Sequence, residues 1–231
     1  MASPAIVTSA SNILSTPATS WAAVPLPASL VADNLLLAFL AVNVRDAAAL
    51  TFPAGWTTFI DSTALATPAT SRVAVAWKKA TGSEGATMTV TNGSTATRFN
   101  AITYQVSGAA DPTTQAPEFA TVTTGSSTST NAGAVAPTGG SKDYLFFVVV
   151  ASGSGTSATV PTNYGGRIST SNALDISFAT CNRQATTASE DPGAWAISPT
   201  NPWLTTVVAV HPPAAAGAGQ PWDYYARQMG A

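Results

Sequence analysis

Histidine, cysteine and charged side chains are scarce in this chain of 231 residues. His211 is the only histidine and Cys181 the only cysteine. An intrachain disulfide is therefore excluded, and so is a metal site built on His and Cys. A Ser-His-Asp triad would need His211, but no G-x-S-x-G elbow is present. Because phosphate-binding G-x-x-x-x-G-K-[ST] and dinucleotide-binding G-x-G-x-x-G loops are also missing, we expect no catalytic residues, no metal and no cofactor.

Low charge also limits the partners of the chain. Charged residues make up 9% of it, against an ordinary share of about 25%, and the net charge is −2. No basic stripe is present, which argues against nucleic-acid binding. The longest apolar runs, residues 35–42 and 145–151, fall short of the ~20 residues of a membrane helix. The N-terminus lacks the basic and apolar regions of a secretory signal, so we expect synthesis in the cytoplasm without membrane insertion.

One unit of sequence occurs twice. The first copy is DNLLLAFLAV followed by FPAGWTTF, beginning at Asp33 and Phe52; the second is DYLFFVVVA followed by VPTNYGGRI, beginning at Asp143 and Val160. Each copy is an apolar run, a polar loop and a Pro/Gly turn that carries an aromatic residue. The first run does not alternate, which predicts a strand buried on both faces, or at least a place in a crowded inner sheet. Because further features recur in the same order, we infer an internal duplication.

The chain has no helical period, and turn-rich loops separate short segments of strand-like sequence. The alternation at residues 72–78 is typical of a strand, and Asn92-Gly93 predicts a hairpin turn. We therefore expect an all-β fold: a duplicated antiparallel β-sandwich or jelly-roll-like body with a pseudo-twofold repeat, an extended N-terminal arm and a C-terminal tail. Two tandem sandwiches or one fused body would fit. We favour the fused body, because packing the two apolar runs together buries the most apolar surface.

The expected organisation has five parts. They are an N-terminal arm (1–18), a first β-repeat (19–108), a connector (109–128), a second β-repeat (129–213), and an Ala/Gly linker with an aromatic tail (214–231). The tail is rich in residue types that are enriched at interface hot spots. These residues, which we expect to dock on a neighbouring subunit, are Trp222, Tyr224, Tyr225, Arg227 and Met229.

Two kinds of candidate site remain in the body of the chain. Trp56, Tyr164 and Trp203 lie in or near turns, where exposed aromatic rings could contact a glycan; alternatively, each ring packs over a sheet as part of the core rim. Glu84 and Glu190 occupy equivalent places in the two copies. A glycosidase needs two carboxylates about 5–10 Å apart, whereas turn carboxylates commonly cap backbone amides.

The segments DNLLLAFLAV, FPAGWTTF, RVAVAWKKATGSEGATMTV, AITYQVSGA, SEDPGAWAIS and WLTTVVAVHPP together resemble β-sandwich, jelly-roll-like virion structural proteins of tailed bacteriophages and prophages. The resemblance covers residues 32–212, about four-fifths of the chain. His211 stands where that group would have Arg, and Tyr164 replaces a second Trp.

The resemblance implies a non-enzymatic virion protein: a capsid decoration or cement protein, a head spike, or a neck or tail appendage. It would be attached through its terminal segments, with other virion proteins and copies of itself as partners. A carbohydrate-binding adhesin that contacts a host-surface glycan is the alternative, and a glycosidase is a more remote one.

Overall fold

A computed structural model describes residues 3–43, 49–63, 71–93, 96–153, 157–172 and 176–214. Within these ranges the chain is all-β, with no helix and therefore none that could cross a membrane. The strands are β1 (Ala5–Ala18), β2 (Ser20–Pro25), β3 (Leu35–Asn43), β4 (Thr57–Thr63), β5 (Ser71–Lys79), β6 (Thr87–Thr91), β7 (Thr97–Ser107), β8 (Glu118–Phe119), β9 (Thr123–Asn131), β10 (Lys142–Gly153), β11 (Ser157–Thr159), β12 (Gly165–Asn172), β13 (Ile176–Thr187) and β14 (Ala194–Val210).

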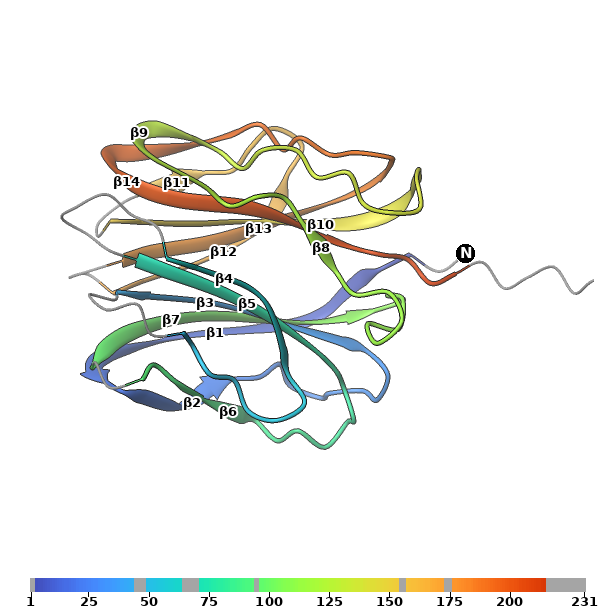
Figure 1. Cartoon of the computed structure of the whole chain (residues 1–231), viewed down its shortest axis with the longest axis horizontal. Helices are drawn as coiled ribbons and strands as arrows, with labels where there is room; N and C mark the ends of the chain where they lie inside the picture. Colours follow the sequence, from blue (N-terminus) through green and yellow to red (C-terminus); the bar gives the residue numbers. More distant parts are fainter. Residues whose placement is uncertain are drawn as a thin grey trace, which may run out of the picture.

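The strands form three antiparallel sheets stacked in layers (Figure 1). Sheet A has the order β1-β7-β3-β5-β4, and sheet B pairs β2 with β6. Sheet C has the order β11-β14-β10-β13-β12, with β8 and β9 also paired to β14. Sheets A and C therefore share one pattern, in which β7-β3-β5-β4 corresponds to β14-β10-β13-β12.

Sheets A and C pack face to face through one apolar cluster. Alternate residues of β3 and β10 point into this central cluster, and the rings of Phe39 and Phe147 lie 5.5 Å apart. The opposite face of β3, including Leu40, packs under sheet B, and that of β10, including Phe146, packs under Trp195. Both strands are buried on both faces, as the unbroken apolar run predicts for β3.

The structure differs from the sequence-based expectations near the N-terminus and at the Asn92-Gly93 turn. Most of the expected N-terminal arm is strand β1, which pairs with β7 at the edge of sheet A. The hairpin prediction at Asn92-Gly93 is wrong, because this turn joins β6 in sheet B to β7 in sheet A. The Asn92 N–H donates to the Thr19 carbonyl at 2.8 Å, so the turn is tied to the connection between β1 and β2 instead.

Both ends of the described chain lie at one end of the molecule (Figure 1). Near the N-terminus, the Ser3 hydroxyl donates to Asp143 at the start of β10. Near the other end, Val210 of β14 is the register partner of Leu145, also at the start of β10. Residues 3 and 214, the first and last that the structure describes, therefore lie at the same end of the body.

Candidate functional site

An apolar surface lies where the edges of sheets A and C meet. Strand β4 is the last strand of sheet A, and β8 lies on the outer side of β14 in sheet C. Phe59 of β4 and Phe119 of β8 meet there edge to face, with ring centroids 5.6 Å apart. Val122, just after β8, packs against the same central cluster. We call these three residues the Phe59–Phe119 band.

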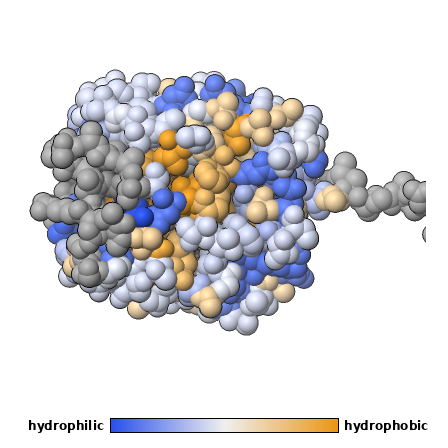
Figure 2. Space-filling view, in the orientation of Figure 1, coloured by the Kyte–Doolittle hydropathy of each residue, from blue (hydrophilic) through white to orange (hydrophobic). Residues whose placement is uncertain are grey.

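The Phe59–Phe119 band is partly open to solvent. Phe119 is 42% exposed, while Phe59 and Val122 are partly buried. In the same orientation as Figure 1, Figure 2 shows hydrophobic surface across the middle of this face, between the two main sheets. A contiguous apolar area with a polar surround is typical of a protein-docking surface, because water is readily displaced from it.

Glu118 holds the short strand β8 in place and so orients Phe119. Its carboxylate accepts the Thr138 N–H at 3.0 Å and lies 2.8 Å from Nε2 of His211. Burial alone would raise the pKa of Glu118, but hydrogen bonds from Thr138 and His211 outweigh it, so this pKa lies below its ordinary value. Burial lowers the pKa of His211, against the opposing effect of Glu118. At neutral pH the pair is therefore a carboxylate and a neutral imidazole that donates from Nε2.

Several strands leave an outer edge open within the described chain, among them β1, β9 and β12. Ser and Thr make up most of β9, and neither β1 nor β9 contains a charged residue. Proteins commonly protect long edge strands with charges, prolines or bulges, because unpaired N–H and C=O groups recruit other strands. The nine-residue β9 has none of the charges or prolines that usually prevent such pairing.

The aromatic residues predicted to contact a glycan do not form one platform. Trp56 is partly buried and packs beside Phe52 in the cluster between sheets A and B, with ring centroids 6.2 Å apart. Tyr164 and Trp203 belong to the cluster on the outer face of sheet C and are only 7% and 8% exposed. The Trp203 indole N–H donates to Ser127 of β9 at 3.0 Å, so this ring fixes an edge strand.

Glu84 and Glu190 belong to separate local networks. Glu84 accepts the Thr81 hydroxyl at 2.9 Å within its own turn. Glu190 is buried and bridges Arg183 at 2.8 Å and the Tyr164 hydroxyl at 3.1 Å. Burial and the neighbouring Glu190 raise the pKa of Tyr164, which stays protonated and donates to the carboxylate. Both glutamates therefore bind groups of their own half of the chain.

The other described carboxylates also have structural partners. Asp61 pairs with Arg72 across neighbouring strands. Asp111 accepts from Lys79 at 2.8 Å, and this hydrogen bond is the main reason that the pKa of Asp111 falls to about 2. Asp191 accepts the Gly193 N–H at 3.2 Å in a tight turn. Within the described residues, no group of three or more His, Cys, Asp or Glu side chains could hold a metal ion.

The predicted docking residues of the tail (Trp222, Tyr224, Tyr225, Arg227 and Met229) lie outside the described residues. Sequence reasoning missed Phe119, because it follows the Pro-rich part of the connector and no periodic pattern surrounds it. The Phe-x-x-Val spacing of Phe119 and Val122 is the only local signal. Comparisons with protein-family models, curated proteins and solved structures found no match.

Proposed function

We propose that this protein is a non-enzymatic structural component of a tailed-phage virion, in which the Phe59–Phe119 band docks against a neighbouring subunit. The observation that carries the proposal is the exposed Phe119 at the junction of the two sheet edges. The uncharged edge of β9 is continuous with this surface through β14, so apolar contacts and strand pairing could act together. The role itself is a capsid decoration or cement protein, a head spike, or a neck or tail appendage, as the sequence resemblance implies.

The proposal also takes the chain to be an internal duplication with pseudo-twofold symmetry. The equal strand order of β7-β3-β5-β4 and β14-β10-β13-β12 supports it, together with the repeated sequence unit. The jelly-roll-like description stays a prediction. A duplicated body suits a virion component, because its stability comes from a large core and needs no disulfide.

Attachment through the terminal segments is the second part of the proposal. The two ends of the described chain emerge together, so the first residues and the tail at 215–231 can reach one partner surface. The other end of the body would then project away from the particle. Copies of this chain and other virion proteins are the partners that we propose, in a particle assembled in the bacterial cytoplasm.

The carboxylate contacts support a non-enzymatic role. In the body of the chain, Glu84 and Glu190 are bound within different networks, so glycosidase chemistry is the weakest alternative. A carbohydrate-binding adhesin built on Trp56, Tyr164 and Trp203 is also less well supported, because two of these rings are nearly buried. The proposed virion contacts, by contrast, use the exposed Phe119 of the Phe59–Phe119 band.

The direct test is occupancy on purified particles, measured as copies per virion by quantitative mass spectrometry. We expect Phe119→Ser and a deletion of residues 220–231 each to lower occupancy, while the thermal unfolding midpoint of the free protein changes little. Val31→Ser is the matched control, because Val31 is 54% exposed and lies in a loop before β3. Undiminished occupancy of both altered proteins would reject the docking proposal, and absence of the wild-type protein from particles would reject the virion role.

A further inference from the structure

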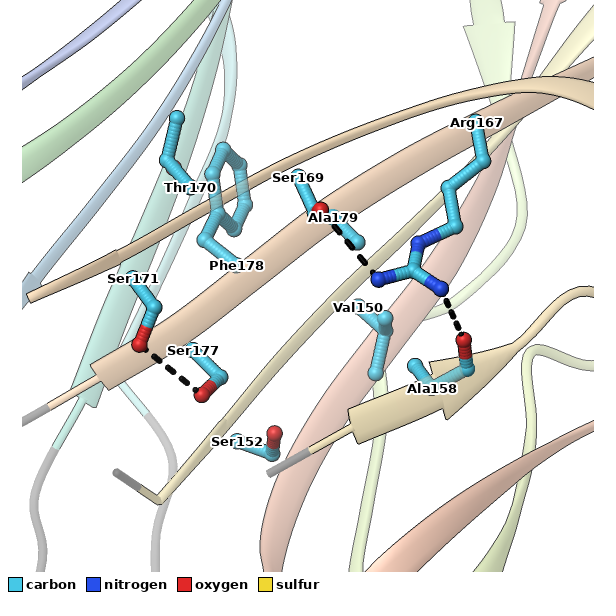
Figure 3. A pocket seen from close by; sticks show the side chains of 10 residues that line it. All are labelled: Val150, Ser152, Ala158, Arg167, Ser169, Thr170, Ser171, Ser177, Phe178 and Ala179. Carbon is cyan, nitrogen blue, oxygen red and sulfur yellow. Dashed lines mark hydrogen bonds between the residues drawn. The ribbon is translucent and has the colours of Figure 1, made fainter. Parts of the chain in front are cut away.

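A groove of about 360 Å³ lies on the outer face of sheet C, away from the Phe59–Phe119 band (Figure 3). Its floor comes from β10 and β13, one wall from β12 and the other from β11. The volume is at the small end of ligand pockets, which suits a single sugar ring or a ligand of similar size.

Strand register explains why the surface is hollow at this place. Ser152, Ser177 and Ser171 are register partners across β10, β13 and β12, so three hydroxyl side chains form one row. The next row is Val150, Ala179 and Ser169, by the same pairings. Small side chains in two adjacent rows leave space that the bulky residues earlier in β10 fill.

Arg167 closes the end of the groove near β11. Its Nη1 donates to the Ala158 carbonyl at 2.5 Å, and its Nη2 donates to the Ser169 hydroxyl at 3.2 Å (Figure 3). These bonds use two of the five guanidinium donors, and the side chain is exposed, so further donors are available to a ligand. Among the described residues that line the groove, Arg167 is the only charged one.

Ser152 is the feature that points to a ligand. The residue is 3% exposed and lines the groove, yet its hydroxyl has no hydrogen-bond partner among the described residues, and no dashed line reaches it in Figure 3. A nearly buried hydroxyl that faces a groove and has no protein partner can form its hydrogen bonds only with water or a ligand in that groove. By contrast, the hydroxyls of Ser171 and Ser177 lie 3.3 Å apart and satisfy each other.

We propose that this groove binds a carboxylated sugar, such as a hexuronic-acid residue. The carboxylate would pair with Arg167, the ring hydroxyls would bond to Ser152 and Ser169, and the ring C–H groups would contact Val150 and Ala179. A lone inorganic anion at Arg167 has neither the hydroxyl groups to bond to Ser152 and Ser169 nor the C–H groups to contact Val150 and Ala179. The groove and the docking band use different strands, so this inference does not depend on the proposed virion role.

The test is a titration of the full ¹⁵N-labelled chain with sodium D-glucuronate, D-glucose and sodium acetate, followed by amide chemical shifts. We expect saturable glucuronate binding with shifts at residues 150–152, 167–171 and 177–179. Glucose should bind at least about tenfold more weakly, because it lacks the charged partner of Arg167. Acetate should leave the Ser152 amide unshifted.

Two substitutions test the assigned contacts. Arg167→Gln should weaken glucuronate binding about tenfold or more, and Ser152→Ala about two- to tenfold with no loss of thermal stability. Arg98→Gln is the matched control, because Arg98 also donates to a strand carbonyl, that of Ser15 at 2.6 Å, but lies in sheet A. An absence of saturable shifts in the groove, equal affinity for glucose, or unchanged affinity of Arg167→Gln would each overturn the proposal.

Discussion

The Glu118–His211 pair is the residue contact with the clearest pH dependence. Nε2 of His211 lies 2.8 Å from the Glu118 carboxylate, and the imidazole is almost fully buried against Tyr144. The pKa of His211 is below its ordinary value of 6.5, mainly because of burial, and that of Glu118 is below its ordinary 4.5. In both cases the unfolded chain binds a proton more readily than the folded one.

We therefore predict that the free energy of unfolding falls as the pH drops below about 6.5 and falls further through the range in which Glu118 is protonated. His211→Gln keeps a donor near Glu118 but cannot titrate, so its stability should change less between pH 7 and pH 5. Urea denaturation at a series of pH values measures the free energy of unfolding of the wild type and of His211→Gln. A wild-type curve that is flat over this interval, or one that runs parallel to that of His211→Gln, would contradict the prediction.

Single residues also show what the sequence could not reveal. Tyr164 stands in a turn equivalent to that of Trp56, and both were candidates for glycan contact. Tyr164 is buried because its hydroxyl meets Glu190, a residue that lies in the other half of the same repeat and reaches it only after folding. The spacing of residues in the sequence predicts the turn itself. Whether the aromatic ring in that turn is buried depends on partners that are distant in the sequence. The lone hydroxyl of Ser152 was equally invisible, since only the strand register defines its neighbours.

At the scale of elements, the long apolar strands were predictable and their neighbours were not. The unbroken apolar run in β3 predicted burial on both faces, and both β3 and β10 are buried in this way and central in their sheets. The Asn92-Gly93 turn carries a strong local hairpin signal, yet β6 and β7 belong to different sheets. Strand β7 buries more apolar surface beside the long β3 than it would beside the short β6. Packing therefore overrides the local turn preference.

The position of edge strand β9 depends on a close contact between Gly125 and the Trp203 indole. Gly125 faces Trp203 across the β9–β14 pair, and a Cβ atom at this position would lie 2.4 Å from Cζ2 of the indole. The indole can lie over the strand only because Gly125 has no side chain. This contact and the Trp203–Ser127 hydrogen bond add to the backbone pairing with β14 that holds β9 on the body.

We predict that Gly125→Ala pushes β9 away from the indole and destabilises the protein by about 1–3 kcal/mol, the usual result of overpacking. Hydrogen exchange of the amides at residues 123–131 should become faster, with little change elsewhere. Ser126→Ala, at the exposed neighbouring position, is the control and should exchange like the wild type. The double variant Gly125→Ala with Trp203→Phe should recover part of the protection, because the smaller ring makes room for the methyl group. Unchanged exchange in Gly125→Ala would show that the indole is free to move aside.

At the scale of the whole molecule, the central cluster joins the two halves of the chain. Phe147 from the second half lies 4.7 Å from Tyr104 and 5.5 Å from Phe39, both from the first half, measured between ring centroids. The hydroxyl of Tyr104 also lies 2.6 Å from that of Thr180 in β13. The sequence favoured such a fused body over tandem sandwiches on burial grounds alone. The side chains that form the contact between the two halves could not be predicted from the sequence, because they depend on how the two sheets align.

A fused core predicts that the two halves unfold together. Phe146 tests this better than Phe147, because its ring points to the outer cluster of sheet C and not to the central cluster that joins the halves. Phe146→Ala removes a fully buried ring and should lower the free energy of unfolding by about 3–5 kcal/mol.

If unfolding is cooperative, the slowest-exchanging amides of β3 should lose the same protection free energy as those of β10, although Phe146 belongs to a cluster without β3 residues. Native-state hydrogen exchange measures both strands in one experiment, with Phe147→Ala as the variant that acts directly at the interface. Unchanged protection of β3 in Phe146→Ala would mean that the two halves are separate folding units that only pack together.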